Sequence, residues 1–251
     1  MEPDTDIGGG AGRFPATERS AVLATRSADA VVRQRAFGAL IAAYWKPIYK
    51  YIRIQWRAGN EEAKDLTQEF FARAMEKGYF AQYDPAKAAF RTYLRTCIDG
   101  FVANERKAER RLKRGGGSVL VPLDFTGVEG ELAGHEPADG SDMDAYFRQE
   151  WVRSLFGLAV DELSRRCAAA GKSTQFAVFE RYDLRDDEPA ARPTYAQLGA
   201  QLGLPVTQVT NYLSWARREF RVIVLERLRE LTGSDAEFRS EARLLLGVEP
   251  P

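Results

Sequence analysis

The sequence predicts an all-α fold in which two small helical domains are joined by an acidic flexible linker. From about residue 29 onward, apolar residues recur mostly at the spacing of amphipathic helices. Three consecutive glycines at 115–117 stop this pattern, and a second helical pattern starts near Met143. A chain of 251 residues is long enough for one large domain or two small ones, and the interruption favours two.

The first helical domain is expected at residues 29–114, after a flexible N-terminal tail at 1–28. Its first helix has an apolar stripe up to Trp45, and we expect Pro47 to interrupt or restart that helix. Asn60 is a good N-cap for a second helix, which begins acidic. A third, long helix should follow Asp84-Pro85 and end near residue 114. These elements predict a compact bundle of three or four helices.

The long third helix changes character along its length. Between Phe90 and Val102 its apolar residues recur at helical spacing, so one face is expected to be buried. Beyond Asn104 the apolar stripe fades and cationic side chains replace it. A helix that is anchored in a core at one end and cationic at the other suits an anionic ligand. The cationic residues are Arg106, Lys107, Arg110, Arg111, Lys113 and Arg114.

The formal net charge is zero, but the charges are segregated along the chain. Residues 31–114 hold 18 Lys and Arg against 9 Asp and Glu, whereas residues 115–150 hold 1 against 8. Such asymmetry suggests a nucleic-acid-binding part and an acidic connector. Solvated helix faces are the alternative explanation. We expect the connector to be a linker at 115–142, part extended and part mobile.

The second domain is expected at residues 143–232 and contains a helix-turn-helix pattern. Thr194 and Gln197 form a capping box, Gly203 provides a left-handed stop, and Pro205 can begin the second helix. Short polar side chains on the outward face can reach base edges, and the arginines that follow can bind phosphates. An ordinary helical hairpin with a polar face is the alternative. The outward residues are Thr207, Gln208, Thr210, Asn211, Ser214, Arg217, Arg218 and Arg221.

The remaining sequence offers no catalytic or metal site. One histidine, His135, and two distant cysteines cannot supply a structural zinc site or a catalytic triad, so we expect no enzyme, metal or cofactor. Gly171-Lys172-Ser173 lacks the leading glycine of a phosphate-binding loop. The N-terminus has no apolar core and no run could span a bilayer, so we expect a cytoplasmic protein without membrane insertion.

The two helical units together resemble the sigma-70 family of bacterial RNA polymerase sigma factors, of the extracytoplasmic-function (ECF) type. KDLTQEFFARAMEKG at 64–78 and FRTYLRTCIDGFVANERKAERR at 90–111 resemble the family's region 2. YAQLGAQLGLPVTQVTNYLSWARREFR at 195–221 resembles its region 4. The resemblance covers roughly residues 30–231. It implies a protein that binds core RNA polymerase and directs promoter recognition, DNA melting and transcription initiation at a dedicated promoter set.

The resemblance also implies roles for individual residues. The outward face from Thr207 to Arg221 would read the −35 element as duplex DNA. The helix from Phe90 would hold the melted −10 element by stacking and cationic contacts, through Tyr93, Arg95, Asn104, Arg106, Lys107, Arg110 and Arg111. Tyr93 could equally be a core residue, and helical periodicity favours this alternative. Core polymerase would be bound by Asp65, Gln68, Glu69 and Arg73. The acidic linker would occupy the RNA exit path, and an anti-sigma factor is a candidate partner.

The sequence departs from the family in three places. Pro205-Val206-Thr207-Gln208 replaces the usual start of the recognition helix, so base preference cannot be carried over. The loop at 183–193 is longer than usual. The tail at 233–251 contains an additional short helix, Ser234–Gly247, which packs on region 4 or binds a regulator. Two rival functions are a helix-turn-helix transcriptional regulator and a polymerase-binding antagonist without promoter specificity.

Overall fold

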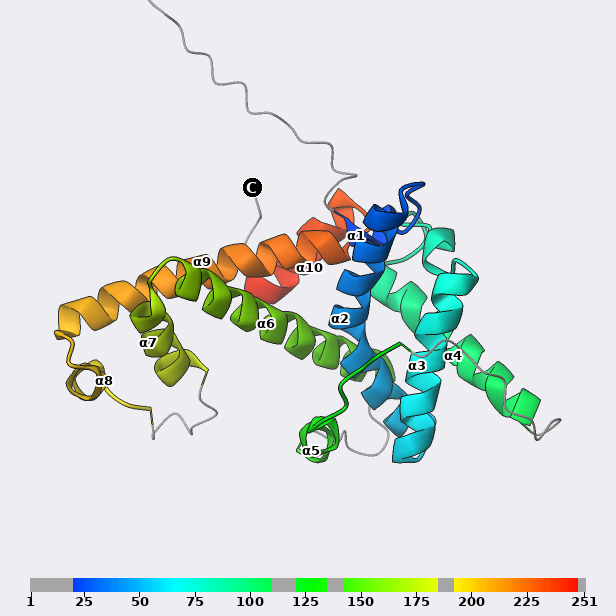
Figure 1. Cartoon of the computed structure of the whole chain (residues 1–251), viewed down its shortest axis with the longest axis horizontal. Coiled ribbons are helices and arrows are strands. Elements are labelled where there is room, and N and C mark those ends of the chain that lie inside the picture. Colours follow the sequence, from blue (N-terminus) through cyan, green and yellow to red (C-terminus); the bar gives the residue numbers. More distant parts are fainter. Residues whose placement is uncertain (1–19, 110–120, 135–141, 185–191, 248–251) are drawn as a thin grey trace, which may run out of the picture.

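The computed structural model describes residues 20–109, 121–134, 142–184 and 192–247, and these residues form helices and no strand (Figure 1). The predicted all-α class is confirmed. The α-helices are α1 (Ala21–Ala24), α2 (Ala30–Gln55), α3 (Asn60–Glu76), α4 (Phe90–Glu109), α5 (Val128–Ala133), α6 (Met143–Ala169), α7 (Ser173–Asp183), α8 (Tyr195–Leu202), α9 (Val206–Leu231) and α10 (Asp235–Leu246), and a 3-10 turn, η2, spans Phe80–Gln82.

Helices α2, α3 and α4 form an N-terminal bundle with an aromatic core. Phe70 packs edge-to-face against Phe101, and Phe90 packs in the same way against Tyr44 and Phe80, with ring centroids 5.6–5.7 Å apart. Such pairs stabilise a core beyond the area that they bury. The apolar stripes predicted for these helices therefore meet in one place.

Pro47 lies inside α2 and does not interrupt it, so the expected break in the first helix was wrong. The proline ring is buried, and Tyr44 and Ile48 beside it are also fully packed. Burial on both sides of the proline offsets the lost backbone hydrogen bond and holds the helix together. The second helix begins one residue from the expected cap, because Gly59 is the N-cap of α3.

The C-terminal half packs directly on this bundle along α2 and α6. Trp151 of α6 stacks on Tyr44, and Phe147 meets Tyr51 edge-to-face with ring centroids 5.5 Å apart. Both helices contribute to one continuous hydrophobic core. The predicted boundaries of the two domains remain predictions, but their described parts share buried apolar surface.

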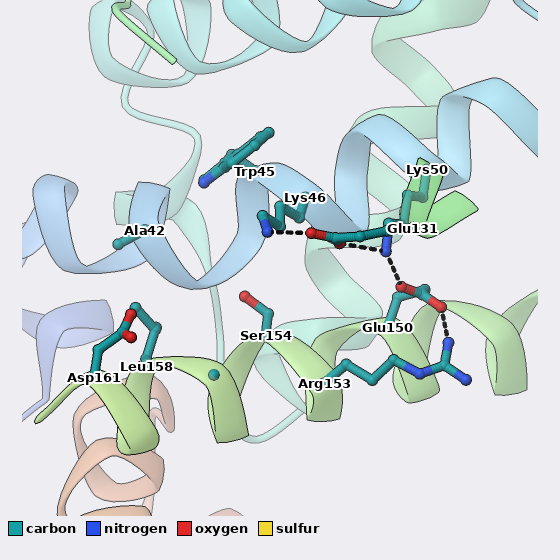
Figure 2. A pocket seen from close by; sticks show the side chains of 11 residues that line it. Ala42, Trp45, Lys46, Lys50, Glu131, Glu150, Arg153, Ser154, Leu158 and Asp161 are labelled. Carbon is teal, nitrogen blue, oxygen red and sulfur yellow. Dashed lines mark hydrogen bonds and ion pairs between the residues drawn. The ribbon is translucent and has the colours of Figure 1, made fainter. Parts of the chain in front are cut away.

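A chain of ion pairs crosses the α2–α6 contact (Figure 2). Lys50 of α2 binds Glu150 of α6 at 2.8 Å and Glu131 at 3.0 Å, and Glu131 also binds Lys46 at 2.6 Å. Glu150 also pairs with Arg153. These side chains line a cavity of about 460 Å³ between α2, the α5 segment and α6. Because basic and acidic side chains alternate in this series of ion pairs, the cavity wall has no excess of either charge.

Helices α8 and α4 lie at opposite ends of the molecule's long axis, and α6 and α9 span the distance between them (Figure 1). Helix α9 packs on α6 and α7, and α10 starts next to the bundle and folds back along α9. The predicted C-terminal helix is confirmed, with Ser234 as N-cap and a left-handed Gly247 at its end.

Two segments that were expected to be flexible contain helices. Residues 20–28 of the predicted tail include α1, where Val22 is buried and the Ser20 hydroxyl donates to the Thr232 carbonyl at 2.6 Å. The predicted linker includes α5, with Val128 and Leu132 buried. The expectation of a flexible chain was therefore wrong for these residues. Both segments are held in place because they bury apolar side chains. Residues 1–19, 110–120 and 135–141 lie outside the described residues.

Candidate nucleic-acid and polymerase interface

Local capping signals place α8 and α9 at a short turn. The Thr194 side chain accepts a hydrogen bond from the Gln197 N–H at 3.2 Å, and the Gln197 side chain accepts from the Thr194 N–H at 2.8 Å. Gly203 ends α8 with φ of 67°, a conformation that favours glycine. Gly199 allows a close approach of the turn, since a Cβ there would lie 2.6 Å from the Leu204 carbonyl oxygen. The predicted capping box and left-handed stop are confirmed.

The face predicted to read DNA on α9 is exposed along its whole length. The opposite face holds Val209, Leu213 and Ala216, all of which are buried. Short polar groups therefore occupy the first three turns, and arginines follow on the same face. The exposed residues are Thr207, Gln208, Thr210, Asn211, Ser214, Arg217, Arg218 and Arg221.

Arg217 differs from the other two arginines of this face because it is held within the protein. Its Nε and Nη2 both donate to the Asp183 carboxylate at 2.8 Å, and its guanidinium lies over the Tyr182 ring. The hydrogen bonds to Asp183 raise the pKa of Arg217 above its usual value. Such a bidentate pair orders the side chain. Arg218 and Arg221 form no ion pair with a described residue and are the groups available to a phosphate.

The residues predicted to bind melted DNA on α4 do not share one face. Asn104 and Lys107 are exposed, whereas Arg95 and Arg106 lie at the edge of the helix and are half-buried. Arg106 binds Glu62 of α3 at 2.9 Å and lies over the Trp56 ring. Arg95 pairs with Asp99 on its own helix and with Asp144 of α6. Arg110 and Arg111 lie outside the described residues.

Tyr93 is a half-buried residue packed against the bundle core. Its ring lies 5.4 Å from that of Tyr83, and its hydroxyl donates to the Tyr79 carbonyl at 2.7 Å. Burial raises the pKa of the Tyr93 hydroxyl, and a hydrogen bond with Cys97 raises it further. These contacts favour the core alternative that periodicity had left open.

The polymerase-binding residues predicted on α3 lie on a face that is partly tied to α4. Asp65 is exposed and Gln68 is half-buried. Arg73 binds Glu69 at 2.6 Å and also pairs with Glu105 of α4. The Arg73 side chain therefore links the two helices, and of the four predicted residues Asp65 presents the most accessible group.

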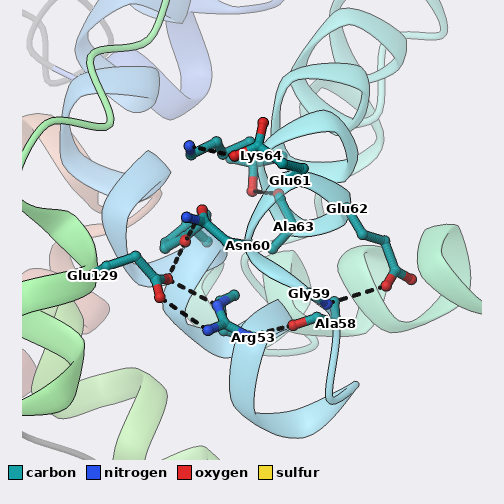
Figure 3. Close-up of polar contacts among 11 residues, drawn as sticks. Arg53, Ala58, Gly59, Asn60, Glu61, Glu62, Ala63, Lys64 and Glu129 are labelled. Carbon is teal, nitrogen blue, oxygen red and sulfur yellow. Dashed lines mark hydrogen bonds and ion pairs between the residues drawn. The ribbon is translucent and has the colours of Figure 1, made fainter.

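The acidic connector neutralises cations of α2 through α5 (Figure 3). Arg53 binds both oxygens of Glu129 at 2.8 and 2.9 Å, and the Tyr49 hydroxyl donates to the same carboxylate. The hydrogen bond from Arg53 is the main reason why the pKa of Glu129 falls to about 2. The sequence showed the opposite charges of the two segments but not this pairing, because the partners lie far apart in the chain.

Two classes of site have no support in the part of the chain that the structure describes. No group of three or more His, Cys, Asp or Glu side chains there is arranged to hold a metal ion. Cys97 and Cys167 are free thiols, and burial raises the pKa of both, which disfavours the reactive thiolate.

None of the described helices is long and apolar enough to cross a membrane.

The comparison with known families gives one match, in the N-terminal bundle. Residues 40–112 match the family model for Sigma-70 region 2, and this range includes most of α2 and the whole of α3 and α4. The match shows that this bundle is similar to region 2 of sigma-70 factors, a non-enzymatic class whose partners are core RNA polymerase and promoter DNA. No curated protein and no solved structure is significantly similar to the chain.

Proposed function

We propose that this protein is an ECF-type sigma factor that binds core RNA polymerase and directs initiation at a dedicated promoter set. The observation that carries the proposal is the combination of a Sigma-70 region 2 match over residues 40–112 with a second, exposed polar helix face on α9. A transcriptional regulator that acts only through a helix-turn-helix has no need of the N-terminal bundle. The order of the two elements is that of the family.

In this proposal α9 reads duplex DNA at the −35 element. Gln208 and Asn211 are exposed near its start, and amide side chains can bind the donor and acceptor pair on adenine in the major groove. Arg218 and Arg221 lie two to three turns further on and bind phosphates, which orients the helix without sequence preference. The anchored turn before Val206 supports this role, since it holds the start of the helix rigidly against α8.

The basic end of α4 binds the melted −10 element in the same proposal. Lys107 is exposed there and the sequence continues with Arg110 and Arg111. Single strands are held by cationic surfaces and by stacking on aromatic rings. The ion pairs of Arg95 and Arg106 mean that these two side chains must exchange a carboxylate for a phosphate if they are to take part.

Core polymerase is bound by α3 through Asp65, Gln68, Glu69 and Arg73, of which Asp65 is the most exposed. The Arg73 pairs with Glu69 and Glu105 order the surface around Asp65. An ordered polar surface loses little conformational entropy when a partner binds, which favours this face as a protein-binding site.

The test of the function is run-off transcription with purified core polymerase and a library of genomic fragments. We expect transcripts that start at a limited set of promoters and depend on the added protein. Core binding without promoter-specific transcripts would instead support the polymerase-binding antagonist. Specific duplex binding with no affinity for core polymerase would support an ordinary helix-turn-helix regulator.

A sharper test concerns the basic residues that follow α4 in the sequence. Changing Arg110→Ala and Arg111→Ala together should weaken promoter binding and reduce its salt dependence, because each lost phosphate contact lowers the slope by about 0.7–0.9. Binding to core polymerase should be unchanged. The matched control is Arg35→Ala with Arg239→Ala, which removes the same charge at exposed sites on α2 and α10. Equal promoter affinity in the two double variants would contradict the role given to Arg110 and Arg111.

A further inference from the structure

The first turn of α4 is capped by a carboxylate from the far end of the chain. Glu237 of α10 accepts a hydrogen bond from the Phe90 N–H at 2.7 Å, and also from the Gly233 N–H at 2.8 Å and the Tyr83 hydroxyl at 3.2 Å. Free N–H groups at the start of a helix attract anions. In this structure Glu237 occupies that position on α4.

The next cation on α4 is enclosed by the same C-terminal helix. Arg91 binds Glu241 of α10 at 2.8 Å, and its guanidinium lies 5.0 Å from the centre of the Trp151 ring on α6. Only 15% of the Arg91 side chain is exposed. One turn later, Arg95 pairs with Asp144 at the start of α6. The C-terminal half thus supplies a carboxylate to each of the first two arginines of α4.

A carboxylate and a phosphate bind an arginine through the same hydrogen bonds, so they compete for it. Resting on the function proposed above, we propose that Asp144, Glu237 and Glu241 form an autoinhibitory latch that keeps nucleic-acid phosphates from the first two turns of α4. The latch is open when α10 and the start of α6 have moved away from α4.

The contacts around Arg91 carry costs that favour such an opening. The Glu241 Oε2 and the Trp151 Nε1 are buried and have no hydrogen-bond partner among the described residues. A buried polar atom without a partner destabilises the closed arrangement relative to one in which water reaches it. Burial also raises the pKa of the Glu237 carboxyl, because it penalises the charged form in this position. Asp144 is 59% exposed, so its pair with Arg95 is an easily exchanged surface contact.

The test measures binding of a fluorescein-labelled oligo(dT) strand by anisotropy. The latch variant carries Asp144→Asn and Glu241→Gln, which remove the α6 and α10 carboxylates from Arg95 and Arg91 and leave the Glu237 cap in place. Two additional cations should tighten binding about tenfold and steepen the salt slope by about 1.4 for a single strand. The matched control carries Asp161→Asn and Glu226→Gln, which make the same change in charge away from α4 and remove one of the two carboxylates that bind Arg166.

The proposal would be overturned if the latch variant binds oligo(dT) no more tightly than the control does. A second measurement uses the wild-type protein, so it does not depend on how the variant folds: saturating oligo(dT) should increase hydrogen exchange in α10. Unchanged exchange in α10 would also count against the latch. Run-off transcription separates the two proposals. If the wild-type protein gives no promoter-specific transcripts, the proposed function is contradicted. If it gives normal transcripts and the latch variant binds oligo(dT) no differently, only the latch is contradicted.

Discussion

The ion pair between Lys50 and Glu150 is the deepest polar contact between the two halves of the protein. The side chains are 4% and 1% exposed, and their charged atoms lie 2.8 Å apart. Removing one partner of a buried pair leaves an uncompensated charge and typically costs about 3–5 kcal/mol. After Glu150→Leu, Lys50 keeps only the half-exposed Glu131 at 3.0 Å. We therefore expect a loss of about 3 kcal/mol, the lower end of this range.

The assay is urea unfolding followed by far-ultraviolet circular dichroism, supported by thermal melts. For a chain of this size, about 3 kcal/mol corresponds to a fall of roughly 6–12 °C in Tm. The double variant Lys50→Met with Glu150→Leu removes both charges and should recover most of the loss, since apolar replacement of a buried pair is often neutral. A Glu150→Leu protein within about 1 kcal/mol of wild type, or a double variant that is less stable than the single one, would refute the reasoning.

Two further predictions concern the α8–α9 turn and the α5 contact. Gly199→Ala should destabilise the turn by about 1–3 kcal/mol, because its Cβ would overlap the Leu204 carbonyl. Binding to duplex promoter DNA should fall, while binding to core polymerase should not change. A variant with the duplex affinity of the wild type would contradict this prediction. The folded pKa of Glu129 is about 2, below its usual 4.5, so its pair with Arg53 stabilises the protein above pH 4.5 and is lost as pH falls towards 2. The stability gap between wild type and Glu129→Gln should therefore narrow over that range in urea unfolding, and a constant gap would argue against the pairing.

Signals that act over a few residues were sufficient to predict much of the fold. Thr194 and Gln197 cap α8, and Ser234 and Gly247 bound α10, all as the sequence indicated. Such caps involve only the next turn of the helix, so their partners are adjacent in the chain. The exposed polar face of α9 was likewise predictable, because helical periodicity separates it from buried residues on the same helix.

The state of the candidate site depends instead on partners that are distant in the sequence. Arg95 and Arg106 look like free cations in the sequence, yet the structure pairs them with Asp144 and Glu62. Pro47 was expected to break a helix that tertiary packing keeps intact. For both arginines the deciding neighbour comes from another helix, whose position follows from the packing of the whole core.

The sequence by itself determined the all-α class, the limits of α8 and α10 and the exposed face of α9, because helix periodicity and capping are local properties. Only the tertiary structure decided that α6 and α10 pack against α2 and the start of α4. Those contacts join Glu150 to Lys50 and Glu241 to Arg91. Their physical basis is burial of the aromatic surfaces of both halves in one core, which brings together charges that no local pattern relates.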